Sequence, residues 1–230
     1  MVKSNFDTYG TKAAREKLVE RLIQINLLKT PHVIKAFLKI PRHAFLPEAF
    51  KELSYSDQAL PIGFGQTISQ PSTVAVMTEL LDIQANHRVL EIGSGSGYQT
   101  ALLAELAGKV FTIESQPELS RSAQKRLEDL GYYTVRFMIG DGSAGWSDCA
   151  PFDRIIVTAG SPSVPKPLAA QLSESGKMVL PLGNHQTQQI TSVIKCAQEY
   201  RLVSEGSCKF VDLVGQYGWP VSCQRVSNRS

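Results

Sequence analysis

The stretch from residue 88 to residue 100, RVLEIGSGSGYQT, constrains the fold more than any other part of the chain. It begins with a short apolar run, continues with the alternating glycines Gly93, Gly95 and Gly97, and leads into an apolar, helix-compatible segment. This order of strand, glycine loop and helix is typical of α/β sheets that offer backbone groups to an adenosine-containing ligand. The glycines permit positive φ and close approach of the ligand. The stretch therefore predicts a nucleotide-type site.

Three acidic residues accompany the glycine loop. Glu91 lies inside the first strand, Glu114 ends the next apolar run, and Asp141 stands between two glycines after a third strand. An acid at the end of the second strand is within reach of a ribose diol, and we expect Asp141 to accept from an adenine amino group. A carboxylate at Glu91 favours a cationic ligand, the α-amino group of S-adenosylmethionine (SAM). We predict SAM, with a nicotinamide oxidoreductase as the alternative that the G-x-G-x-G spacing disfavours.

The segment LPIGFGQTISQP, residues 60–71, is the second unusual stretch. Its prolines and glycines exclude a regular helix interior, and it leads directly into a predicted helix. A hydroxyl-rich loop at this place can fold over the ligand and close the site. Ser69 can equally be the N-cap of the following helix, and both interpretations stay open. Arg42 and His43, further upstream, are interpreted as structural or solvated.

Composition limits the class of protein. The chain has 230 residues, 43% hydrophobic and 20% charged, with a net charge of +3 and no long basic run. We expect one large α/β domain, no nucleic-acid partner, no membrane segment and a cytoplasmic location. Histidine spacing indicates no metal site, and the cysteines form no C-x-x-C pair, which favours reduced thiols. The cysteines are Cys149, Cys196, Cys208 and Cys223.

The order of elements predicts a doubly wound, mostly parallel sheet with a late antiparallel pair. Expected helices cover residues 11–28, 31–40, 72–81, 117–130 and 165–175. Expected strands cover residues 89–92, 110–113, 135–139, 152–158, 177–182, 189–196 and 208–214. We divide the single domain into an N-terminal helical cover (1–57), a catalytic α/β core (58–215) and a tail (216–230).

The chain resembles the protein-L-isoaspartate O-methyltransferase family over nearly its whole length. The resemblance is carried by ALPIGFGQTISQP (59–71), VLEIGSGSGYQTALLA (89–104), GDG (140–142), PFDRIIVTAG (151–160) and FVDLVG (210–215). Other SAM-dependent methyltransferases share the glycine loop but not GQTISQP. The resemblance implies a class I methyltransferase fold and methyl transfer from SAM to the α-carboxylate of isoaspartyl residues in damaged proteins and peptides. The methyl ester then initiates repair through a succinimide. We expect a monomer that releases S-adenosyl-L-homocysteine.

The resemblance also implies residue roles. The family's active-site serine falls on Ser69. Its SAM contacts fall on Thr67, Ile68, Ser69, Glu91, Gly93, Ser94, Gly95, Gly97, Glu114, Asp141 and Gly142. Its substrate contacts fall on Pro61, Ile62, Gly63, Ala159, Val211, Leu213 and Val214. The chain departs from the family at Asp212, commonly proline, at Lys209, commonly arginine, and at Ser175, where many members have glycine. Strand alternation predicts that Asp212 points away from the face of Val211 and Leu213.

The chemistry requires alignment more than proton transfer. A carboxylic acid with a pKa of about 4 is already ionised at neutral pH, so no strong general base is needed. We expect Ser69 to hold the attacking carboxylate or the loop by a hydrogen bond. Main-chain pairing with residues 211–214 would tolerate many flanking sequences. A SAM methyltransferase for another carboxylate, and a SAM-binding module without catalysis, remain as alternatives.

Overall fold

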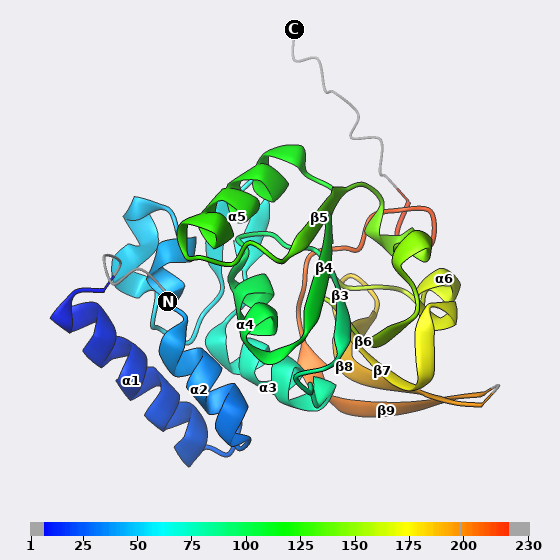
Figure 1. Ribbon diagram of the computed structural model, residues 1–230, viewed down its shortest axis with the longest axis horizontal. Coiled ribbons are helices and arrows are strands. Elements are labelled where there is room, and N and C mark those ends of the chain that lie inside the picture. The colour runs from blue at the N-terminus through cyan, green and yellow to red at the C-terminus, as the bar shows by residue number, and fades with distance from the viewer. Residues whose placement is uncertain (1–6, 198, 221–230) are drawn as a thin grey trace, which may run out of the picture.

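The computed structural model describes residues 7–197 and 199–220, and its core is a seven-stranded sheet (Figure 1). The helices are α1 (Tyr9–Gln24), α2 (Pro31–Lys39), α3 (Pro71–Leu81), α4 (Tyr98–Leu106), α5 (Pro117–Asp129) and α6 (Lys166–Ala170). The sheet strands are β3 (Arg88–Ile92), β4 (Lys109–Glu114), β5 (Arg136–Ile139), β6 (Phe152–Val157), β7 (Leu172–Gly183), β8 (Gln188–Cys196) and β9 (Glu199–Cys208). A separate hairpin pairs β1 (Leu60–Gly63) with β2 (Gln66–Ile68).

The strand order in the sheet is β5-β4-β3-β6-β7-β8-β9. Neighbours from β5 to β7 run parallel, whereas β7, β8 and β9 form antiparallel pairs. The central strands are apolar and buried on both faces, as parallel strands between helices must be. The prediction of a doubly wound, mostly parallel sheet with a late antiparallel pair is confirmed.

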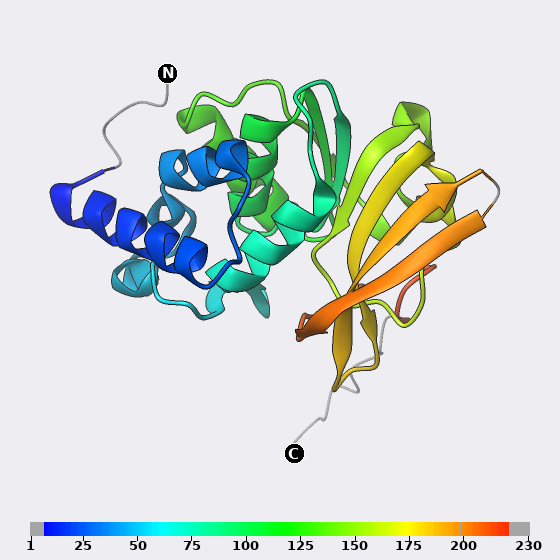
Figure 2. The ribbon, with the colours of Figure 1, turned by 90° about the horizontal axis from the view of Figure 1, so that it is seen from below.

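Helices α1 to α5 lie on one face of the sheet and α6 lies on the other (Figure 2). Strand alternation divides the core accordingly: Val89 packs beneath α4 and its neighbours, whereas Leu90 faces the side of α6. The short 3-10 helices η2 (Arg42–Phe45) and η3 (Glu48–Leu53) follow α2 and complete the helical layer. Two further ones, η4 (Gly142–Ala144) and η5 (Ser147–Cys149), follow β5.

Gly97 allows α4 and α5 to pack closely. It precedes α4 with φ of +90°, and a Cβ atom there would lie 2.8 Å from Leu127 Cδ1 and 3.1 Å from Ala123 Cβ of α5. A side chain at this position would therefore be strained by the backbone conformation and would also displace α5. The third glycine of the loop serves helix packing.

The predicted helix over residues 165–175 is wrong beyond its first turns. Helix α6 has five residues, and β7 begins at Leu172, which is buried and pairs with Phe152 of β6. Ser175 takes φ of +61°, and the register between β6 and β7 shifts nearby. Burial of Leu172 in the sheet outweighs the local preference for helix, and Ser175, where the helix was expected to end, lies at an irregularity within β7.

The predicted strand over residues 208–214 is also wrong. The last strand, β9, lies earlier in the chain and is mostly exposed at the sheet edge. After Cys208 the side chain of Gln188 replaces a strand as the hydrogen-bonding partner of the backbone. Its Oε1 accepts from the Phe210 N–H at 2.8 Å, and its Nε2 donates to the Phe210 carbonyl at 3.3 Å. A polar side chain thus ends the ladder. Beyond it, Asp212 forms a single bridge with Gly160, and Val214 forms one with Trp219.

Several smaller expectations can be placed. The first helix begins two residues earlier than predicted, because Thr8 and Thr11 form a reciprocal capping box, and it ends before Asn26, whose φ is +62°. Cys149, Cys196 and Cys208 are free thiols, whereas Cys223 and the rest of the tail from residue 221 lie outside the described residues. No helix among the described residues has both the length and the apolar character needed to cross a bilayer.

Replacing Gly97 by alanine should destabilise the protein by about 2–4 kcal/mol, through backbone strain and the clash with α5. Urea denaturation measures this loss. Gly10→Ala is the matched control, because Gly10 lies in α1 with only Thr8 Oγ1 near the new Cβ, at 3.9 Å. That change should be neutral or stabilising. Equal midpoints for the two variants would contradict the packing role of Gly97.

Candidate active site

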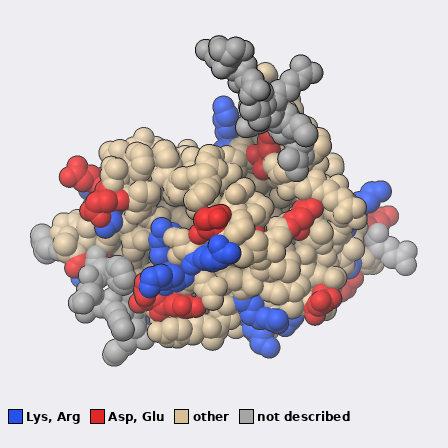
Figure 3. All heavy atoms as spheres, turned by 90° about the horizontal axis from the view of Figure 1, so that it is seen from above, with Lys and Arg blue, Asp and Glu red and all other residues tan. Residues whose placement is uncertain are grey.

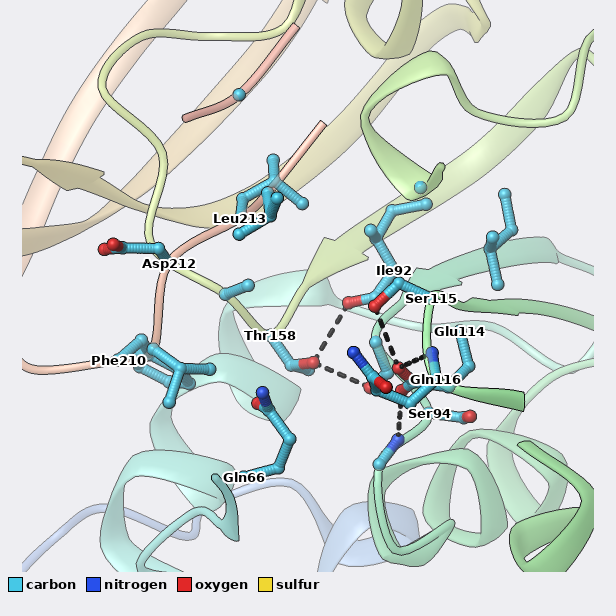
Figure 4. Close-up of a pocket in the computed structure, with 18 of the residues that line it drawn as sticks. Gln66, Ile92, Ser94, Glu114, Ser115, Gln116, Thr158, Phe210, Asp212 and Leu213 are labelled. Atoms are coloured by element: carbon cyan, nitrogen blue, oxygen red, sulfur yellow. Dashed lines mark hydrogen bonds between the residues drawn. The ribbon is translucent and has the colours of Figure 1, made fainter. Parts of the chain in front are cut away.

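A cavity of about 1000 Å³ opens at the carboxyl ends of β3, β4 and β6 (Figure 4). In open α/β sheets, ligands bind in the crevice at this edge. Three segments that are far apart in sequence surround the cavity: the loop that follows β2, the glycine loop after β3, and the chain from residue 210 to residue 218. The site is therefore made by the topology of the sheet.

The glycine loop forms a wall of backbone. The Gly93 N–H donates to the Ile113 carbonyl at 2.8 Å, and the Thr158 hydroxyl donates to the carbonyls of Ile92 and Gly93 at 3.0 and 2.7 Å (Figure 4). A Cβ atom on Gly93 would lie 2.5 Å from Thr158 Oγ1. Only glycine fits between the cavity and this hydroxyl, so a ligand can approach the main chain directly.

Glu114 lines the cavity at the end of β4, where the sequence places it. Its Oε2 accepts from the Gly95 N–H at 2.9 Å, and its Oε1 accepts from the Gln116 N–H at 3.0 Å. The residue as a whole is buried, with a relative exposure of 6%. A carboxylate has about four acceptor positions, so Glu114 can hold the loop and still accept from a diol.

Asp141 connects the cavity with the end of the described chain. Its Oδ1 accepts from the Ser143 N–H and hydroxyl at 2.8 and 2.6 Å, and its Oδ2 accepts from the Gln216 N–H at 2.7 Å. Burial raises the pKa of the Asp141 carboxyl, but the hydrogen bonds from Ser143 and Gln216 outweigh burial and hold this pKa below its ordinary value. Asp141 therefore faces the cavity as a charged group.

Glu91 does not lie in the cavity lining. Strand alternation turns its side chain to the face covered by α4, where it is fully buried and its Oε2 accepts from the hydroxyls of Thr100 and Thr112, both at 2.6 Å. Its Oε1 has no partner among the described residues. Burial raises the pKa of Glu91 to about 7. The structure thus places Glu91 behind the glycine loop and not at its surface, in contrast to the direct ligand contact that we expected.

Ser69 lies on the loop that closes one side of the cavity, together with Thr67 and Ile68. The N-cap of α3 is Gln70, so the structure excludes Ser69 as the cap of that helix. The carbonyl of Ser69 accepts from Nη2 of the buried Arg42 at 2.8 Å. Burial lowers the pKa of Arg42 to about 10, which leaves the guanidinium protonated at neutral pH. The serine hydroxyl is therefore presented by a loop that is fixed through its backbone.

The expected substrate residues divide into two groups. Ala159, Val211, Leu213 and Val214 line the cavity, whereas the segment Pro61-Ile62-Gly63 does not. Ile62 still packs near the glycine loop, since a Cβ atom on Gly95 would lie 3.4 Å from Ile62 Cδ1. Of the expected SAM residues, Thr67, Ile68, Ser69, Gly93, Ser94, Gly95, Glu114, Asp141 and Gly142 line the cavity, and Glu91 and Gly97 do not.

Asp212 lies at the mouth of the cavity with its carboxylate turned away from Glu114 (Figure 4). Its Oδ1 is 3.0 Å from Nδ1 of His185, whose ring stacks near that of Trp219 at a centroid distance of 3.8 Å. Asp212 is exposed while Leu213 is buried, so the two side chains point in different directions, as alternation predicts.

Sequence reasoning missed several cavity residues because their signal is only a polar side chain near a strand end. They are Gln66, Ser115, Gln116, Thr158 and Gln216. Thr158 follows β6 directly, and a hydroxyl at that point was the one signal for it. No group of His, Cys, Asp and Glu among the described residues is arranged to hold a metal ion.

The lining fits an adenosine-containing cation such as SAM. Ser94 Oγ is buried in the cavity wall without a hydrogen-bond partner among the described residues, and such a group is costly unless a ligand satisfies it. Glu114 and Asp141 supply acceptors, and the glycine loop leaves backbone exposed to the ligand. On the face shown in Figure 3, charges of both signs are interspersed.

Comparison with known proteins gives a consistent result. A family model described as protein-L-isoaspartate(D-aspartate) O-methyltransferase matches residues 13–218. A protein-L-isoaspartate O-methyltransferase of Dictyoglomus thermophilum is 50% identical over 93% of this chain and 97% of its own length. One of Methanopyrus kandleri is 47% identical over 90% of this chain and 94% of its own.

Two solved structures are also similar. A protein-L-isoaspartate O-methyltransferase superposes with a TM-score of 0.80 at 30% identity and covers 89% of this chain and 67% of its own. A Plasmodium falciparum protein, described as a putative enzyme of the same kind in complex with S-adenosyl-L-homocysteine, shares the fold, with a TM-score of 0.77 at 20% identity, covering 87% of this chain and 98% of its own.

The burial of Glu91 predicts a pH dependence of stability. Its pKa is about 7 in the folded protein and ordinarily 4.5, so the unfolded chain releases this proton first as pH rises. The group therefore lowers stability progressively between about pH 4.5 and pH 7, by about 3 kcal/mol in total. Glu91→Gln should lack this decline when free energies of unfolding are measured by urea titration across that range. Parallel profiles for the two proteins would contradict the buried, protonated carboxyl.

Proposed function

Because the chain belongs to the protein-L-isoaspartate O-methyltransferase family, we propose that the cavity at the carboxyl edge of the sheet holds SAM beside an isoaspartyl peptide. The protein is a SAM-dependent carboxyl methyltransferase that acts on isoaspartyl residues. One observation carries the assignment of the site: the glycine loop, Glu114, Asp141 and the loop of Ser69 all line one cavity.

Within this cavity, each element receives a role that its contacts support. We assign the ribose to Glu114, at the end of β4, and the adenine to the side of Asp141 and Gly142. The unpartnered hydroxyl of Ser94 is assigned to a polar group of the same ligand. Glu91 is assigned a supporting role, because it holds β3 to α4 and β4 through Thr100 and Thr112.

When bound, SAM supplies the methyl group: the carbon–oxygen bond of the ester forms as the carbon–sulfur bond breaks, and a neutral thioether leaves. The protein has to align the carboxylate and exclude water from it. We assign Ser69 to hold the carboxylate by donating a hydrogen bond. No proton has to be removed from an ionised carboxylate, and this agrees with a cavity whose lining contains no histidine.

Peptide recognition is assigned to the backbone of residues 211–214. On one edge, the Gly160 N–H donates to the Val211 carbonyl at 2.7 Å, and the Leu213 N–H donates to the Gly160 carbonyl at 2.8 Å. Because these two bonds flank Asp212 in its parallel bridge with Gly160, its own backbone N–H and C=O are directed to the opposite edge. This edge can pair with an extended peptide regardless of its side chains, which suits a substrate class defined by backbone damage.

We also propose that the protein works as a monomer in the cytoplasm, without a nucleic-acid or membrane partner. The small net charge of +3 and the lack of a long basic run support the part of this proposal that concerns nucleic acid. A SAM methyltransferase for a small-molecule or other carboxylate is the second candidate. It stays open because the chain departs from the family pattern at Lys209 and Asp212, beside the segment assigned to the peptide.

Methyl incorporation from labelled SAM into an isoaspartyl peptide and into its aspartyl twin separates these candidates. We expect transfer to the isoaspartyl peptide and background labelling of the twin. Equal labelling of both peptides, or labelling of small carboxylates alone, would overturn the peptide assignment. A normal dissociation constant for SAM without any transfer would indicate a binding module.

Replacing Ser69 by alanine tests its role directly. Loss of one hydrogen bond to a charged group should lower kcat by about 10- to 100-fold. The dissociation constant for SAM, measured by calorimetry, should change less than about 3-fold, because other residues supply most SAM contacts. Ser72→Ala is the matched control, since Ser72 lies in the first turn of α3 outside the cavity lining. A Ser69→Ala enzyme with the kcat of the Ser72→Ala control would exclude the proposed role.

A further inference from the structure

Arg42 is the largest fully buried side chain among the described residues, with 0% exposure. It lies in η2, in the helical cover, and the sequence alone suggests no chemical role for it. A charged group that is removed from water loses much of its hydration, and well-packed apolar residues often stabilise a core as well or better. An arginine at this buried position therefore suggests a functional role in addition to core packing.

The contacts of Arg42 indicate that task. Its Nε donates to the carbonyl of Ser54 at 2.8 Å, and its Nη2 donates to the carbonyl of Ser69 at 2.8 Å. Its guanidinium carbon lies 5.1 Å from the ring centroid of Tyr98, which lines the cavity. The planar guanidinium thus joins three parts of the chain: the end of η3, the loop of Ser69 and the start of α4.

We propose that Arg42 is a positioning residue for methyl transfer, because its guanidinium fixes the backbone of Ser69 and so sets the place of the serine hydroxyl in the cavity. The inference rests on the role proposed above for Ser69. A rigid, planar donor set restricts the direction of the carbonyl that it binds more than a flexible ammonium does. The helical cover thereby influences the active site through the side chain of Arg42, although Arg42 itself does not line the cavity.

Arg15 provides a matched control within the same cover. It is also buried, with 5% exposure, and it pairs with both carboxylate oxygens of Asp7 at 2.8 and 2.6 Å. Its Nη1 lies 3.5 Å from the hydroxyl of Tyr55. None of these contacts reaches the loop of Ser69. Loss of Arg15 should therefore weaken the cover without changing the position of the serine.

The experiment compares Arg42→Met with Arg15→Met at a temperature where near-UV circular dichroism shows both to be folded. We expect Arg42→Met to lower kcat for an isoaspartyl peptide by about 10- to 100-fold, with the SAM dissociation constant within about 3-fold of wild type. Arg15→Met should keep kcat within about 2-fold. Equal effects of the two variants on kcat would show a merely structural role and overturn the proposal.

Arg42→Lys keeps the inference testable if the methionine variant does not fold. Lysine retains the charge but not the planar fork, so we expect a kcat about 3- to 10-fold below that of wild type, together with faster amide hydrogen exchange in residues 67–70. Wild-type kcat and exchange in Arg42→Lys would contradict the need for the fixed geometry.

A double variant separates this inference from the proposed function. If Arg42 acts through Ser69, Arg42→Lys should lower kcat much less in the Ser69→Ala background than in wild type. An undiminished effect there would overturn the proposal. Wild-type kcat in Ser69→Ala would instead refute the role of the serine itself. A large loss in Ser69→Ala with none in either Arg42 variant would refute the inference alone.

Discussion

Close approach of the main chain after β3 is the constraint on which the rest of the structure depends. At Gly93 the space of a side chain is filled by the Thr158 hydroxyl, and at Gly97 it is filled by Leu127 of α5. The first contact brings β6 against the loop and the second brings α5 against α4. Because both require a residue without Cβ, the same short segment determines how two layers pack and where a ligand can touch backbone.

The site is held together by polar side chains that come from distant segments. The Asp141 carboxylate accepts a hydrogen bond from the Gln216 N–H, and the Arg42 guanidinium donates one to the Ser69 carbonyl. Each of these links joins a peripheral segment to the carboxyl edge of the sheet. The cavity therefore depends on the sheet topology and also on the links that the α/β core makes to the helical cover and to the chain after residue 210.

The local sequence pattern was sufficient to predict the sheet and the position of Glu114 in the cavity, because apolar runs and strand ends are visible in the sequence. It was insufficient where a distant contact decides the outcome. Leu172, predicted to be helical, pairs with Phe152 in the sheet, and the side-chain amide of Gln188 ends the strand pairing at Phe210. Glu91 illustrates a subtler limit: its position beside the glycine loop is evident, but strand alternation turns the carboxylate toward Thr100. Family resemblance located the Ser69 loop, and Arg42 behind it was not foreseen.

The hydrogen bond from the Gln216 N–H to Asp141 makes the end of the described chain an electrostatic component of the cavity. This donor helps to keep the pKa of Asp141 low, so a chain cut just before residue 216 would lose more than a surface turn. The Asp141 carboxylate would keep its two hydrogen bonds from Ser143 but lose the one that fixes Oδ2. The same cut would remove Gln216 and Gly218 from the cavity lining, so cleavage at the periphery would alter both the wall and the hydrogen bonding beside Asp141.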